Sequence, residues 1–173
     1  MAAPRRVVVV LAAALLLTAS CGSVLRAESP YAQWANGPST DPNWFPIGVW
    51  LQSTSTSRIA QYQAAGFNIY VGLWQGPTET QLANLKARGM KTICSQNTLA
   101  LNSVNRDVII GWSQQDEPDN AQWNSVTQTY DPPILPSEIV NRYNAMKAND
   151  ATRPVFLNLG QGVAWDGWWG RGT

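Results

Sequence analysis

Short apolar runs alternate with amphipathic segments along the chain from residue 44 onward. The apolar runs have the length and the β-branched or aromatic content of buried strands. They cover residues 45–51, 67–71, 90–95, 108–110 and 155–159. The segments between them carry apolar residues at helical spacing, as Ile59 and Tyr62 do. Strands that alternate with helices predict an α/β fold with a parallel sheet and right-handed crossovers.

The predicted helices carry start and stop signals. Thr78, followed three residues later by Gln81, predicts a capping box at the start of the second helix. Gly66 and Gly89 each stand between a helical pattern and the next apolar run. Gly66 is predicted to end the first helix as a left-handed residue, and Gly89 is predicted to end the second. The helix–glycine–strand pattern therefore recurs 23 residues apart, the length of one βα unit.

Residues 119–136 are long for a connection in an α/β unit and are therefore predicted to form a functional loop. Ser137 is predicted to cap the helix that follows. The predicted buried stripe of that helix consists of Ile139, Val140, Tyr143 and Met146.

Two architectures fit this order of elements, a doubly wound open sheet and a (β/α)8 TIM barrel. No glycine-rich phosphate loop follows the first strand, so the dinucleotide-binding signature is missing. Each predicted strand ends in large polar or aromatic side chains, which in a barrel would converge on one mouth. A complete barrel takes roughly 250 residues. Residues 44–173, with about five βα units, are therefore predicted to be the N-terminal part of an incomplete TIM barrel.

Composition narrows the possible chemistry. The chain of 173 residues has 12 basic and 11 acidic side chains, and the basic ones are scattered, so no nucleic-acid partner is expected. Histidine is absent, which excludes Ser-His-Asp and Cys-His catalysis and the usual zinc ligands within this chain. Acid–base work must fall to carboxylates, tyrosine or lysine. Cys94 lies in an apolar run and is predicted to be a small buried residue. We expect no cofactor and no metal.

The N-terminus has the pattern of a targeting segment. Two arginines precede the apolar run 7–17, and small residues follow, so residues 1–20 are predicted to be a signal peptide. The ending resembles that of a bacterial lipoprotein signal, in which Cys21 would be lipidated. Ordinary secretion with cleavage near Cys21 or Ala27 is the alternative. Residues 21–43 are rich in Ser, Pro and Gly and are predicted to be a tether. The mature protein is expected outside the cytoplasm, in the periplasm or at the cell surface.

The acidic segment Asp116-Glu117-Pro118-Asp119 follows the fourth predicted strand. In a parallel α/β protein the carboxyl ends of the strands are where chemistry is assembled. Pro118 disfavours helical backbone angles at the preceding residue, so Glu117 is predicted to be extended. In the alternative interpretation, Asp116 or Asp119 caps the next segment and Glu117 is a solvated loop charge.

Nine tryptophans suit a carbohydrate ligand, because sugar rings stack on aromatic faces while their hydroxyls need amides and carboxylates. Trp44 and Trp112 are the ones predicted to serve core packing alone. The tryptophans predicted to form a binding surface in loops are Trp123, Trp165, Trp168 and Trp169. The residues expected to bind substrate are Trp50, Gln52, Trp74, Gln75, Gln96, Asn97, Gln115, Asp116, Asn158, Gln161 and Trp165.

Residues 44–170 resemble the front half of a retaining glycoside hydrolase of clan A, the (β/α)8 superfamily of β-galactosidase-like and cellulase-like enzymes. The resemblance rests on the order of strands, on Ile110-Gly111-Trp112 with Asp116-Glu117-Pro118, and on Pro154-Val155-Phe156-Leu157-Asn158.

The resemblance implies that Glu117 is the general acid/base of a double-displacement mechanism. Asp116 stands where the family has the asparagine that holds the sugar 2-hydroxyl. The family's nucleophile belongs to the seventh strand and has no counterpart here, so the full-length protein is expected to be a glycosidase and this chain alone inactive.

Two other functions remain open. One is a non-catalytic lipoprotein that binds glycans through its aromatic loops. The other is a lyase or metal enzyme in which Asp116, Glu117 and Asp119 are oxygen ligands of a hard cation.

Overall fold

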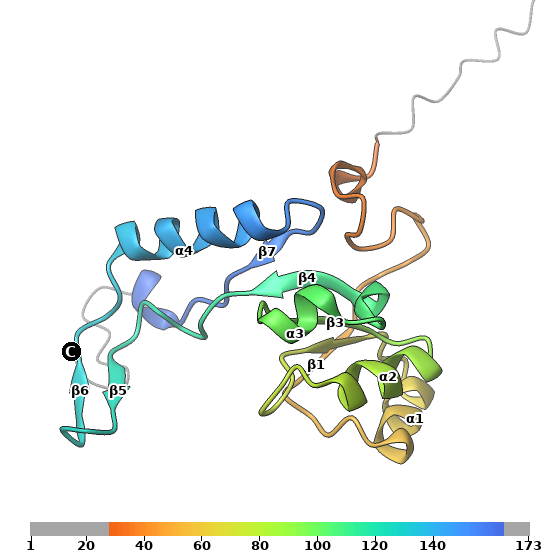
Figure 1. Cartoon of the computed structure of the whole chain (residues 1–173), viewed down its shortest axis with the longest axis horizontal. Helices are drawn as coiled ribbons and strands as arrows, with labels where there is room; N and C mark the ends of the chain where they lie inside the picture. The colour runs from red at the N-terminus through yellow and green to blue at the C-terminus, as the bar shows by residue number, and fades with distance from the viewer. Residues whose placement is uncertain (1–27, 165–173) are drawn as a thin grey trace, which may run out of the picture.

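A five-stranded parallel sheet forms the centre of the fold (Figure 1). The structure, a computed structural model, describes residues 28–164. The strands are β1 (Gly48–Trp50), β2 (Ile69–Val71), β3 (Lys91–Ser95), β4 (Ile109–Ser113) and β7 (Val155–Phe156), and they lie in that order. The predicted α/β class with a parallel sheet is confirmed. In the described part of the chain β1 and β7 do not pair with each other, so the sheet there is open.

The helices are α1 (Thr56–Ala64), α2 (Glu79–Ala87), α3 (Thr98–Asn102) and α4 (Pro136–Asn149), with 3-10 turns η1 (Pro30–Gln33), η2 (Arg106–Val108) and η3 (Gln161–Val163). All four α-helices pack against one apolar cluster, to which they contribute Ile59, Leu82, Leu85, Ala100 and Met146 among others. The strands contribute Val49, Tyr70, Cys94 and Trp112. The helices therefore cover the same face of the sheet. None of the helices in residues 28–164 has the length and apolar character that a bilayer crossing requires.

The other face of the sheet carries a row of residues in register. Trp50 lies opposite Val71, Val71 opposite Ile93, and Ile93 opposite Gly111. Successive side chains of a strand point to opposite faces, so this row faces away from the helices. Trp50 is exposed on it, and Val71 and Ile93 are half-buried.

The amino edge of the sheet is covered by the segment that precedes β1. The backbone N–H of Asn36 donates to the carbonyl of Thr152 over 2.9 Å, and the Asn36 amide donates to the Thr152 hydroxyl over 2.9 Å. Trp44 lines a cavity of about 210 Å³ together with Lys91 and Ile110, at the starts of β3 and β4. Part of the segment predicted as a tether thus lies against the domain.

Several local predictions are confirmed. Thr78 and Gln81 form a reciprocal capping box at the start of α2. Gly66 and Gly89 have φ angles of 90° and 65°, so both helix ends are left-handed. Cys94 is fully buried.

Other local predictions are wrong. Helix α4 begins at Pro136 and follows Leu135, not Ser137, because Pro136 starts a helix without a side-chain cap. Val140 and Tyr143, placed on its buried stripe, are 55% and 43% exposed. Among the described elements, α4 makes its main contact with β7, so that face of the helix has little to pack against.

The loop predicted for residues 119–136 contains an antiparallel hairpin, formed by β5 (Gln122–Asn124) and β6 (Thr129–Asp131). In Figure 1 it projects away from the sheet, beyond the start of α4. The fourth strand also differs from its prediction, because Val108 belongs to η2 and β4 continues to Ser113.

Candidate functional site

A small cavity of about 180 Å³ lies at the carboxyl edge of the sheet. Parallel strands end at the same edge, which brings together residues far apart in the sequence. The strand ends β1, β3, β4 and β7 supply Trp50, Ser95, Ser113 and Phe156, and the segment after β2 supplies Gly72 and Leu73. The other lining residues are Leu51, Gln114, Gln115, Asp116 and Asn158. Of the predicted substrate-binding residues, Trp50, Gln115, Asp116 and Asn158 therefore meet in one cavity.

Polar side chains at this cavity bond to one another. The Asn158 amide donates to Asp116 Oδ1 over 2.6 Å, which links the ends of β4 and β7. Arg142 on α4 donates to Gln115 Oε1 over 2.6 Å and also pairs with Glu138. Sequence reasoning missed Ser95 and Ser113 of the lining. They alternate with the buried Cys94 and Trp112, which is the signal that could have placed them on the open face.

Glu117 occupies a tight turn beside the cavity. Its backbone N–H donates to the carbonyl of Asn158 over 2.9 Å, and its carbonyl accepts from the N–H of Asn120 over 3.1 Å. The predicted extended backbone is wrong: φ is 43°, in the left-handed region. The hydrogen bonds on both sides of the residue hold this conformation, with Pro118 in the second position of the turn. Asp116 lines the cavity, and Glu117, the next residue in the chain, is not among the lining residues.

Asn120 holds the Glu117 carboxylate and was not found from the sequence. Its side-chain amide donates to Glu117 Oε2 over 2.9 Å. Asn120 is 7% exposed, and its Oδ1 is buried without a hydrogen-bond partner. Gln122 donates to the carbonyls of both residues, over 3.1 Å to Glu117 and 2.6 Å to Asn120. A Glu-Pro-Asp-Asn turn brings its first and fourth residues together, and that spacing could have predicted the pair.

Asp119 organises the loop after β7. Its Oδ1 accepts from the N–H of Gly160 over 2.6 Å, and its Oδ2 accepts from the N–H of Val163 over 3.1 Å. The described residues contain no group of three or more His, Cys, Asp or Glu side chains that could hold a metal ion. Asp116, Glu117 and Asp119 thus do not form the cation site considered from the sequence.

Two predicted substrate-binding residues bond to the chain itself. The Gln96 amide donates to the carbonyl of Met146 over 3.1 Å and accepts from Asn149, which joins β3 to α4. Asn97 is the N-cap of α3, and its Oδ1 accepts from the N–H of Ala100 over 2.8 Å.

The remaining predicted residues either do not line the cavity or lie outside the described chain. Gln52 donates to the carbonyl of Trp50 and accepts from the hydroxyl of Tyr62. Trp74 is 65% exposed after β2, Gln75 beside it has a φ of 53°, and Gln161 begins η3. The predicted residues outside the described range are Cys21, Trp165, Trp168 and Trp169.

The hairpin carries an exposed aromatic pair. Trp123 and Tyr130 lie opposite each other with ring centroids 5.3 Å apart. They are 56% and 46% exposed. Trp112, in contrast, is fully buried, which confirms its prediction as a core residue.

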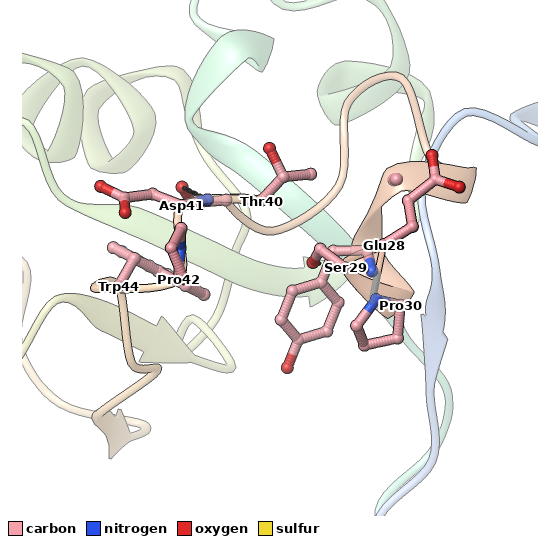
Figure 2. A pocket seen from close by; sticks show the side chains of 10 residues that line it. Glu28, Ser29, Pro30, Thr40, Asp41, Pro42 and Trp44 are labelled. Carbon is pink, nitrogen blue, oxygen red and sulfur yellow. Dashed lines mark hydrogen bonds between the residues drawn. The ribbon is translucent and has the colours of Figure 1, made fainter. Parts of the chain in front are cut away.

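A second, wider pocket of about 560 Å³ lies at the amino edge, lined by Tyr31 and Trp44 among others. The two rings meet edge to face with centroids 6.4 Å apart. Figure 2 shows the carboxylates of Glu28 and Asp41 pointing away from each other. The pocket offers aromatic surface without converging polar groups, so it is the weaker candidate for a site of chemistry.

Two further candidate nucleophiles or acids, Cys94 and Tyr70, stay protonated near neutral pH. Burial raises the pKa of the Cys94 thiol to about 12, although the positive charge of Arg153 opposes it. Burial, with a smaller effect of Tyr62, raises the pKa of Tyr70 to about 12. Both side chains lie on the helix-covered face, so the carboxylates after β4 remain the candidates for acid–base chemistry.

Comparison of the chain with protein-family models, with curated proteins and with solved structures found no match.

Proposed function

We propose that this protein is an exported glycosidase that cleaves O-glycosidic bonds with retention, with Glu117 as the general acid/base. The observation that carries the proposal is the cavity at the carboxyl edge, where Trp50, Asp116 and Asn158 converge beside Glu117.

The order of the strands supports an incomplete (β/α)8 barrel. Five parallel strands follow one another without a reversal of order, and the helices that connect them pack on one face. A doubly wound sheet would have helices on both faces and a switch in strand order. The row from Trp50 to Gly111, on the face that the helices do not cover, would then be part of the barrel interior.

The cavity has chemistry that suits a sugar ring. Trp50 and Phe156 offer aromatic surface for the C–H faces of the ring. Ser95, Ser113 and Asn158 offer hydroxyl and amide groups, and Asp116 offers a carboxylate for sugar hydroxyls. We assign Asp116, with Asn158 bonded to it, to hydroxyl binding.

In the proposed mechanism Glu117 first protonates the departing glycosidic oxygen. It then takes a proton from the water that releases the sugar from the enzyme. A retaining mechanism needs a second carboxylate roughly 5–5.5 Å away as nucleophile. By the resemblance this group lies on a seventh strand, which we place in a part of the complete protein beyond the described residues. Residues 28–164 alone are then expected to bind sugar without cleaving it.

The test is Glu117→Gln in the complete protein, assayed on aryl glycosides of graded leaving-group ability. We expect turnover to fall at least about 100-fold for poor leaving groups and much less for activated ones, whose departure needs little protonation. Azide should partly restore the variant by replacing the activated water. Glu79→Gln on α2, where Glu79 bonds Asn105, is the matched control. Unchanged turnover of every glycoside by Glu117→Gln would contradict the proposal.

The second candidate is a glycan-binding protein without catalysis. The exposed rings of Trp50, Trp74 and Trp123 favour it, because they offer stacking surface without any carboxylate chemistry. Saturable oligosaccharide binding by a complete protein that hydrolyses no glycoside would favour this candidate.

We further propose that the protein is anchored to a membrane by a lipid on Cys21. The proposal rests on the apolar segment and the small residues before Cys21. Mass spectrometry of the mature N-terminus tests it, since an unmodified N-terminus at any other residue would contradict the anchor.

A further inference from the structure

We propose that Asn120 is a positioning residue that aims and stabilises the Glu117 carboxylate for both proton transfers. This inference rests on the proposed function, because it assigns to Asn120 a role that matters only if Glu117 performs acid–base chemistry.

The local geometry joins the two residues through both backbone and side chain. The turn bond from the Asn120 N–H to the Glu117 carbonyl, 3.1 Å long, sets the two side chains on the same side of the turn. The Asn120 amide then donates to Glu117 Oε2 over 2.9 Å. Gln122 donates to both carbonyls and fixes the turn from the hairpin side.

The orientation of the Asn120 amide is unfavourable by itself. Asn120 is 7% exposed and its Oδ1 is buried without a partner, although a buried acceptor normally finds a donor. Turning the amide over would place Oδ1 against the Glu117 carboxylate, where two acceptors repel each other. The carboxylate therefore determines which way the amide points, and the unsatisfied acceptor is the consequence.

Gly160 allows Asn120 to occupy this place. A Cβ on Gly160 would overlap the Asn120 amide. The loop that contains Gly160 is tied to the acidic turn by the bond from the Gly160 N–H to Asp119. A methyl group at position 160 would therefore push Asn120 away from Glu117 without changing either side chain.

An amide donor on a carboxylate oxygen favours the charged form of the carboxyl group and fixes its direction. The charged form is the one that activates water in the second step of a retaining mechanism. Asn120 should therefore matter most when release of the sugar limits turnover, as with activated aryl glycosides.

The experiment compares Asn120→Asp and Asn120→Ala in the complete protein. Asn84→Ala is the control, since Asn84 is half-buried and donates to the carbonyl of Thr54, and neither residue lines the carboxyl-edge cavity. Asn120→Ala should lower kcat on activated glycosides about tenfold at every pH, with little change in sugar affinity. Asn120→Asp keeps the shape of the side chain, and at acidic pH one proton shared with Glu117 can restore the hydrogen bond. At acidic pH the activity of this variant should therefore approach that of the wild type. As the pH rises and the shared proton is lost, its activity should begin to fall at a lower pH than that of the wild type.

Gly160→Ala should lower kcat as Asn120→Ala does. The double variant Gly160→Ala/Asn120→Ala should lose little more in kcat than either single variant. A purely structural role would lower thermal stability in all three variants and would leave the pH profile of Asn120→Asp parallel to that of the wild type. If Glu117→Gln impairs turnover but Asn120→Asp has the wild-type pH profile, the positioning role is wrong and the proposed function stands. If Glu117→Gln leaves turnover unchanged, or no glycoside is hydrolysed at all, the proposed function fails and this role with it.

Discussion

The amino and carboxyl edges of the parallel sheet differ in backbone conformation and in hydrogen bonding, although the same five strands run from one edge to the other. At the carboxyl edge Leu51, Gln75 and Glu117 follow β1, β2 and β4 with φ angles of 48°, 53° and 43°. The only other non-glycine residue with positive φ in the described chain is Gln128, in the hairpin turn. Such backbone costs about 1–2 kcal/mol for each residue with a side chain.

The amino edge is closed by satisfied hydrogen bonds. Arg153, 2% exposed, donates to the carbonyls of Ile109 and Arg106 over 2.8 and 3.1 Å and to Asp150 over 2.6 Å. Its guanidinium lies 5.5 Å from the ring centroid of Trp112, whose indole N–H also donates to Asp150. One buried cation thus joins the starts of β4 and β7.

The amino edge of the sheet holds the fold together, and the carboxyl edge is the part available for chemistry. Strained backbone and an unsatisfied acceptor persist only where the surrounding structure imposes them, and they concentrate at functional sites. In this protein both lie at the carboxyl edge, at Glu117 and Asn120. Substitutions at the amino edge should therefore reduce stability, and those at the carboxyl edge should reduce function.

The largest effect is expected for Arg153→Met. It takes from the nearly buried Asp150 carboxylate its cationic partner and removes the donors to two carbonyls, so the free energy of unfolding should fall by about 3–5 kcal/mol. Urea denaturation followed by circular dichroism measures it. Lys86→Met is the control, because the Lys86–Asp107 pair is exposed and should contribute about 0–1 kcal/mol. Equal losses in the two variants would remove the distinction between the edges.

A smaller effect is expected from acid. Burial alone would raise the pKa of Asp150, but hydrogen bonds from Thr152 and the bond and charge of Arg153 outweigh it and lower the pKa from 3.8 to about 2. The folded state then binds this proton more weakly than the unfolded state. The ionised carboxylate therefore stabilises the fold above about pH 4, by about 2 kcal/mol, and this contribution is lost as the pH falls toward about 2.

Urea denaturation between about pH 2 and pH 5 checks this acid sensitivity. Asp150→Asn should be less stable at neutral pH but should lose less on acidification. Parallel stability curves for the two proteins would show that Asp150 does not carry the effect.

The smallest effect is expected for Gln75→Gly at the carboxyl edge. Glycine adopts a φ of 53° without steric penalty, so this variant should gain about 0.5–1 kcal/mol in the free energy of unfolding. Gln61→Gly, in the middle of α1, should instead lose about 1 kcal/mol. A loss in both variants would show that the backbone at Gln75 is not strained.

Features with a local cause could be predicted from the sequence. The capping box of Thr78 and Gln81, the left-handed residue Gly66 and the end of a helix at Gly89 depend on neighbours within one turn, and all are confirmed. The parallel strands followed from apolar runs of the right length. The start of α4 was missed because Ser137 was preferred over Pro136, although proline is common in a first helical turn.

The candidate site depends on long-range contacts that the sequence does not display. Residues at the ends of all five strands were predicted to meet at one edge. Of these, Trp50, Gln115, Asp116 and Asn158, which belong to three of the strands, line one cavity. Gln96 bonds α4 because of the way that helix packs, which the sequence does not display. The backbone conformation of Glu117 depends on its hydrogen bond to Asn158, 41 residues along the chain. The hairpin was missed because Gln122–Asn124 and Thr129–Asp131 are too short to show an alternating pattern.

Whether the carboxyl edge binds the sugar can be read from the indole N–H signals of the tryptophans in isotope-labelled protein. Neutral gluco-, manno- and galacto-oligosaccharides are titrated while the signals of Trp50 in the carboxyl-edge cavity and Trp44 at the amino edge are followed. We expect a saturable shift of the Trp50 signal, with the signals of Trp44 and the buried Trp112 unchanged. A shift of the Trp44 signal with the Trp50 signal unchanged would place the sugar at the amino edge and show that the carboxyl edge is not its binding site.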